Sequence, residues 1–139
     1  MTATFQEAND EVLAVFKAAW DTTGFIAVYE NVRGDKPTTT APWARASLRN
    51  VTGRQATLAN HDGVRRWRRD GILTIQIFVP LGEGLQEGYS LSKVVTDALE
   101  GTSTPSAVWF RNVSVNEIGP DGEWFQFNVL AEFTYDEVK

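Results

Sequence analysis

Few side chains in this sequence are suited to catalysis. His61 is the only histidine and is followed directly by Asp62, so the two could act together as a general acid and base. There is no cysteine, which leaves no thiol nucleophile and no zinc–thiolate site, and no second histidine to complete a metal site or a triad. The polar run Asn60–Gly63 is typical of a turn. We therefore interpret His61 and Asp62 as solvated loop residues and predict that the protein is not an enzyme.

A short glycine-rich segment, Gly82-Glu83-Gly84, follows an apolar run and could be compared with a phosphate-binding loop. It lacks the Gly-Lys-Ser/Thr sequence that cradles phosphates, and it places an acidic side chain where the phosphate would sit. We interpret it as a flexible entry to a helix, and we expect no cofactor and no metal.

The one concentration of positive charge consists of four arginines around a tryptophan. In a strand, Arg65, Trp67 and Arg69 would share one face, and Arg66 and Arg68 the other. Three interpretations are open: a contact between subunits in which the guanidinium forks meet carboxylates, a solvated strand end, and a contact with nucleic acid. Arginine–aromatic clusters are typical of interface hot spots. We therefore rank assembly first and predict an oligomer interface at Arg65, Arg66, Trp67, Arg68 and Arg69.

Length and composition indicate one soluble domain spanning residues 1–139. Hydrophobic residues make up 42% of the chain and charged residues 22%, which is ordinary for a globular protein. The formal net charge of −5 argues against a nucleic-acid or membrane-surface role for the molecule as a whole. No run approaches 18 apolar residues and no signal peptide is recognisable, so we expect no membrane association and no secretion signal.

Two helices are expected from apolar residues at helical spacing. The first spans Phe5–Trp20, with Thr4 and Glu7 forming a capping box at its start. The second lies within Leu85–Gly101, with Ser90 or Ser92 as candidate caps and Gly101 at its end.

Alternation of apolar and polar residues predicts the strands. The central one places Leu73, Ile75, Ile77 and Val79 on one face, and Pro80 ends it. The other expected strands span Phe25–Tyr29, Trp43–Val51 with a continuation over Arg54–Leu58 after an interruption at Gly53, Ala107–Ile118, and Glu123–Tyr135. Asn31–Pro42 is expected to be a loop, either a mobile arm or part of an interface. The predicted fold class is α+β, with two helices packed on a mostly antiparallel sheet of four or more strands.

Three segments of the chain carry a recognisable pattern. They are Arg54–Leu58 (RQATL), Gly63–Gly71 (GVRRWRRDG) and Gln76–Gly84 (QIFVPLGEG). Together with the aromatic strand near the C-terminus, they resemble the tail-terminator-like proteins of long-tailed bacteriophages. The order of the segments matches over most of the chain, from the first helix to the last strand.

The resemblance implies a structural virion protein with a tail-terminator-like fold. Such subunits form a ring of six on the end of the completed tail tube, stop its polymerisation and present a surface to the head connector. The implied partners are further copies of the chain, the tail tube protein, the head–tail connector protein, and DNA that passes through without sequence-specific binding. The implied location is the virion tail, and the host cytoplasm during assembly.

Two alternatives remain open. One is another head–tail joining or minor tail protein, because the doubled arginines around Trp67 are one variant of a loosely kept motif. The other, of a different class, is a small-ligand or nucleic-acid-binding module that uses the tryptophan and arginine surface. The acidic net charge counts against that module. We interpret the remaining tryptophans as core or interface packing in preference to a ligand cage: Trp20, Trp43, Trp109 and Trp124.

Overall fold

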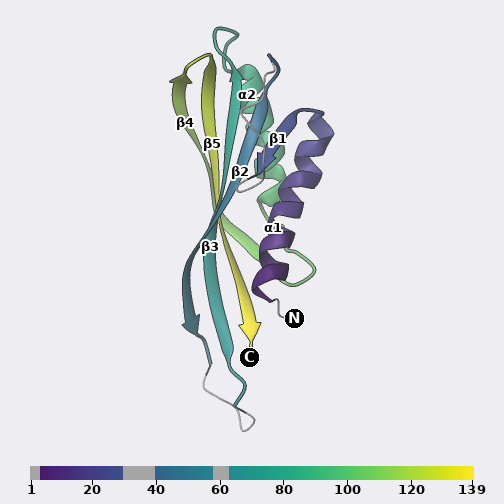
Figure 1. Ribbon diagram of the computed structural model, residues 1–139, viewed down its shortest axis with the longest axis vertical. Coiled ribbons are helices and arrows are strands. Elements are labelled where there is room, and N and C mark those ends of the chain that lie inside the picture. Colours follow the sequence, from purple (N-terminus) through teal and green to yellow (C-terminus); the bar gives the residue numbers. More distant parts are fainter. Residues whose placement is uncertain (1–3, 30–39, 58–62) are drawn as a thin grey trace.

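Five strands form one sheet, and two long helices lie side by side on one of its faces (Figure 1). The computed structural model describes residues 4–29, 40–57 and 63–139. The strands lie in the order β1-β2-β3-β5-β4, and only the β1–β2 pair is parallel. This confirms the predicted α+β class. In chain order the elements are α1 (Phe5–Trp20), the 3-10 turn η1 (Asp21–Thr23), β1 (Ile26–Tyr29), β2 (Trp43–Gln55), β3 (Arg66–Pro80), α2 (Gln86–Leu99), β4 (Trp109–Asp121) and β5 (Trp124–Val138).

The first helix begins and ends where its local sequence predicts. The Thr4 hydroxyl accepts a hydrogen bond from the Glu7 N–H at 3.2 Å, so one of the free donors of the first turn is satisfied. After the helix, Gly24 adopts a left-handed conformation (φ 75°), which reverses the chain toward β1. The Trp20 indole N–H donates to the Ile26 carbonyl at 3.2 Å and ties the helix to that strand.

The centre of the sheet is the antiparallel pair of β3 and β5. Their register runs without a break from Arg66 opposite Val138 to Pro80 opposite Trp124. The side chains of both strands that face the helices are buried, as their period of two predicts, and each large aliphatic contributes about 1.5–3 kcal/mol of gross burial. These buried residues are Leu73, Ile75, Ile77 and Val79 from β3, and Phe127, Val129, Ala131, Phe133 and Tyr135 from β5.

The strand β2 continues through Gly53 without interruption, so the break that was predicted at Gly53 is in the wrong position. The register shift falls between Asn50 and Thr52, and Gly53 is paired opposite Arg69. The parallel strand β1 pairs with Trp43–Ala46 only. Among the described residues, the outer edge of β2 beyond Ala46 therefore has no neighbouring strand.

The second helix starts earlier in the structure than serine capping predicts. Leu85 occupies the cap position and makes no side-chain capping bond, while Ser90 and Ser92 lie within the helix. The predicted serine caps are therefore wrong. The helix is positioned by packing: Gly88 lies against the Phe127 ring so closely that a Cβ there would be 2.0 Å from a ring carbon.

The β4–β5 hairpin turns at Gly122, which adopts φ 64°, a left-handed conformation that glycine takes without a steric cost. The last strand is longer than its aromatic pattern indicates, because it continues beyond Tyr135 to Val138. This extension brings two further acidic residues into the sheet, Asp136 and Glu137.

The outer face of the sheet is the face that points away from α1 and α2. At one end it carries a second apolar cluster of Trp43, Phe78 and Trp124, all buried. The Trp43 and Phe78 rings stack with centroids 4.2 Å apart, and the Arg45 guanidinium lies 5.4 Å from the Trp43 centroid. These residues alternate with the core residues of their strands, so the sheet buries aromatic side chains on both faces.

Some predicted features lie outside the described residues. His61 and Asp62 belong to this group, as does most of the expected loop Asn31–Pro42. In the described ranges, no three acidic, histidine or cysteine side chains are grouped so that they could hold a metal ion. None of the described helices has the length and apolarity needed to cross a membrane.

We predict that Gly88→Ala lowers the free energy of unfolding by about 1–3 kcal/mol, because the added methyl group must displace the buried Phe127 ring. Urea unfolding followed by circular dichroism would measure this. The matched control is Ser90→Ala, which lies exposed in the same helix and should change stability by less than about 0.5 kcal/mol. A stabilised Gly88→Ala variant would contradict the close packing of α2 on β5.

Candidate functional site

The predicted arginine cluster lies at the start of β3, and its residues alternate between the two faces of the sheet. Arg66 and Arg68 are on the outer face, and Trp67 and Arg69 are on the face that carries the helices. Arg65 lies just before the strand, where its backbone exchanges two hydrogen bonds of 3.0 Å with Lys139. The structure therefore separates the cluster into two groups.

The outer group is paired with a carboxylate of the last strand. Arg68 lies opposite Asp136 in the register and binds it with both ends of its fork, Nε to Oδ1 at 3.0 Å and Nη2 to Oδ2 at 3.3 Å. The Arg66 Nε lies 3.9 Å from the same carboxylate. The side chains of Arg66 and Arg68 are 49% and 36% exposed, so their outward surfaces are available for contact.

The inner group is paired with the next carboxylate. Arg69 donates from Nε and Nη2 to Glu137 Oε1, at 3.2 and 3.0 Å, and its guanidinium lies 5.9 Å from the Trp67 ring centroid. The opposite residue on β2 is Gly53, and a Cβ there would lie 2.3 Å from Arg69 Nη1. The glycine thus makes room for the arginine side chain.

Sequence reasoning missed Asp136 and Glu137. Both lie 68 residues from the arginines that they bind. The available signal was the antiparallel pairing itself, because extending the last strand by three residues places these carboxylates opposite the arginines. The assignment of the cluster to an oligomer interface remains a prediction, since the described contacts are within one chain.

A third acidic residue, Asp70, forms a polar network next to the cluster on the outer face. Its Oδ1 accepts from the Thr134 hydroxyl at 2.7 Å and from Arg111 Nη2 at 3.2 Å, and its Oδ2 accepts from the Thr52 hydroxyl at 3.0 Å. Asp70 and Arg111 line a cavity of about 210 Å³, together with Val51, Thr52, Gly71, Ile72 and Glu132. The network joins β2, β3, β5 and β4 across the sheet.

The pKa of the Asp70 carboxyl lies below its usual value. Burial is the largest single influence and raises this pKa. Hydrogen bonds from Thr134 and Thr52 favour the ionised form and lower it, and the positive charges of Arg111 and Arg54 act in the same direction and together outweigh burial. A carboxyl whose pKa is lower in the folded state stabilises the fold above its unfolded pKa, and that contribution is lost as the pH falls through the folded pKa.

The other tryptophans are used in packing. Trp20, the last residue of α1, is buried in the main core, and Trp43 and Trp124 belong to the outer aromatic cluster. Trp109 is half-buried and lies under the Arg68 guanidinium, which is 5.6 Å from its ring centroid. The loop Gly82–Gly84 is exposed and leads into α2.

We predict that Asp70→Asn lowers the free energy of unfolding at pH 7 by about 1 kcal/mol, because an amide accepts hydrogen bonds from Arg111 and the threonines more weakly than a carboxylate does. The difference from the unchanged protein should shrink as the pH falls below about 3.9, the usual unfolded value. Urea unfolding at several pH values would measure it. Asp97→Asn, whose side chain is 62% exposed, is the control and should have little effect. A difference independent of pH would contradict the role of the ionised carboxyl.

Comparisons with known proteins agree with this architecture. A search of curated proteins finds no match. One solved structure shares the fold with a TM-score of 0.64 and 14% sequence identity, covering 91% of this chain and 94% of that chain; at this identity the likeness shows the fold alone. The family model described as phage tail terminator protein matches residues 9–130. Because this match covers most of the chain, the protein belongs to the phage tail terminator family and is a structural component of the phage tail.

Proposed function

We propose that the chain assembles into a homohexameric ring that caps the end of the tail tube, stops its polymerisation and joins the tube to the head connector. The observation that carries this proposal is the family match over residues 9–130. Among the described residues, two different sheet edges lack a neighbouring strand along most of their length, β4 on one side and the part of β2 beyond Ala46 on the other. A closed ring needs contacts between two different surfaces of the subunit, and unlike edges can supply them.

The outer arginine group is a candidate contact in such a ring. The Arg66–Asp136 pair is long, at 3.9 Å, and its arginine is half-exposed, so it contributes only about 0–1 kcal/mol to the stability of one subunit. Removing an arginine fork such as that of Arg68 costs about 2–5 kcal/mol once a neighbouring subunit has covered it. In this proposal a neighbour covers Arg66 and Arg68 on the outer face, and DNA passes through the ring without sequence-specific contacts. Assembly takes place in the host cytoplasm before the ring becomes part of the virion.

We predict that the purified protein forms six-membered rings, at high concentration or on tail tubes, and that it stops the lengthening of tubes. Native mass measurement over a range of concentrations would give the ring size. Electron microscopy of tubes grown with and without the protein would show whether it decorates their ends. A protein that stays monomeric and leaves tube length unchanged would contradict the proposal.

We predict that the double variant Arg66→Ala, Arg68→Lys weakens ring formation while changing the free energy of unfolding of the monomer by less than about 1 kcal/mol. The lysine is chosen because the Asp136 side chain is only 13% exposed and needs one positive partner. Thermal unfolding and native mass measurement would separate the two effects.

The control for this variant is Arg65→Ala, whose guanidinium Nη1 donates to the Gly63 carbonyl of its own turn at 3.2 Å. It should change neither property. If the double variant unfolds the monomer, the outer arginines serve the fold. If assembly is unchanged, they are solvated surface.

A further inference from the structure

The two layers of the molecule carry opposite charge. The helical layer, defined as residues 4–29 and 81–108, holds eight carboxylates and two lysines, a formal charge of −6. Both lysines already bind an acidic residue one helical turn away, Lys17 to Asp21 and Lys93 to Asp97. The eight carboxylates are Glu7, Asp10, Glu11, Asp21, Glu83, Glu87, Asp97 and Glu100.

The outer face of the sheet is positive, although the whole chain has a formal charge of −5. The strand registers place six arginines and four carboxylates on this face, a formal charge of +2. The arginines are Arg45, Arg49, Arg54, Arg66, Arg68 and Arg111, and the carboxylates are Asp70, Asp121, Glu132 and Asp136.

Two of these arginines are placed for contact with another molecule. Arg49 and Arg54 are both exposed, and both lie on the part of β2 that extends past β1. Arg54 forms no ion pair with any described residue; the carboxylate that its charge influences is Asp70. In Figure 1 both helices lie on the other side of the sheet, so neither covers this face.

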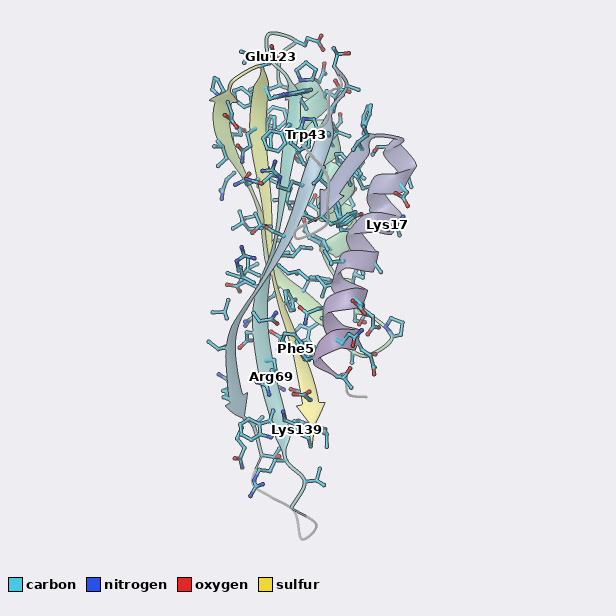
Figure 2. The ribbon with its side chains drawn as sticks, in the orientation of Figure 1. Phe5, Lys17, Trp43, Arg69, Glu123 and Lys139 are labelled. Carbon is cyan, nitrogen blue, oxygen red and sulfur yellow. The ribbon has the colours of Figure 1, made fainter. Side chains whose placement is uncertain are left out.

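The acidic start of α1 and the exposed arginines of β2 lie at the same height along the molecule, on opposite sides of the sheet. The Asn50 amide donates to the Asn9 side chain at 3.2 Å. Arg49 and Asp10 are the sequence neighbours of these two residues, so they lie at about the same level along the molecule. At the same end, the Ser106 N–H donates to Glu11 at 3.0 Å, so the segment that follows Glu100 also lies beside the first turns of α1. Figure 2 shows Phe5 and Arg69 at this end of the molecule.

We propose that the outer face of one copy packs against the helical layer of the next copy, with Arg49 and Arg54 facing Asp10 and Glu100. This deepens the proposed function and rests on the ring proposed there. A closed ring relates neighbouring copies by rotation alone, so the two contact surfaces must be different. In a ring whose strands run along its axis, the two surfaces must also lie at the same height along that axis. Both conditions hold here. Opposite charges also steer the correct encounter.

The same charges disfavour the competing arrangements. A two-fold dimer through the helical layers would bring two surfaces of −6 together, and one through the outer faces would bring together two positive surfaces. DNA is the other anionic candidate for the outer face. Arg66, Arg68 and Arg111 are already bound to carboxylates of their own sheet, which reduces the charge left for phosphates.

Two charge-reversal variants of the full chain would test this interface. The sheet variant carries Arg49→Glu and Arg54→Glu, and the helix variant carries Asp10→Lys and Glu100→Lys. Each should keep its circular dichroism spectrum and need at least about tenfold more protein to assemble, because like charges then face each other. In an equal mixture, every acidic sheet can face a basic helical layer. The mixture should therefore assemble within about threefold of the unchanged protein, as rings with equal numbers of the two variants by native mass measurement.

The control variant, Arg65→Glu with Lys139→Glu, has the same change in net charge as the sheet variant, but both residues lie on the other side of the sheet. It should assemble like the unchanged protein. The interface is wrong if the sheet variant assembles normally, if mixing restores nothing, or if the sheet variant loses only affinity for duplex DNA. An unchanged protein that neither assembles nor caps tubes would instead overturn the proposed function.

Discussion

The unbroken antiparallel pairing of β3 with β5 is the constraint on which the rest of the structure depends. Side chains alternate along both strands, so one register decides the contents of both faces. In the observed register, Ile75 and Val129 face the helices, while Arg68 and Asp136 meet on the outer face. A shift of one strand by a single residue would turn its apolar side chains outward and its charged ones into the core. Burial of the apolar face therefore also selects the ion pairs.

A sheet with both helices on one side must stabilise its other side differently. Here the outer face uses an aromatic cluster around Trp43 at one end and arginine–carboxylate pairs around Asp70 and Asp136 at the other. These pairs hold the arginines in fixed positions while leaving part of their surface exposed. Such a face suits a subunit of the tail terminator family, whose structural role implies association with other phage proteins.

The sequence predicted those parts of the fold and site that depend on neighbouring residues. The capping bond between Thr4 and Glu7 and the alternation of the arginines on either side of Trp67 were both foreseen, because capping and side-chain period are set within a few residues. The α+β class followed from the same periods.

Only the tertiary structure decided how distant segments meet. It placed the bulge between Asn50 and Thr52, started α2 where Gly88 fits against Phe127, and extended the last strand so that Asp136 reaches Arg68. The same packing put the negative charge of the helices and the arginines of the outer face on opposite sides of the molecule. The sequence alone could not determine these features, because each depends on a strand register or a close contact that is set by the burial of the whole core.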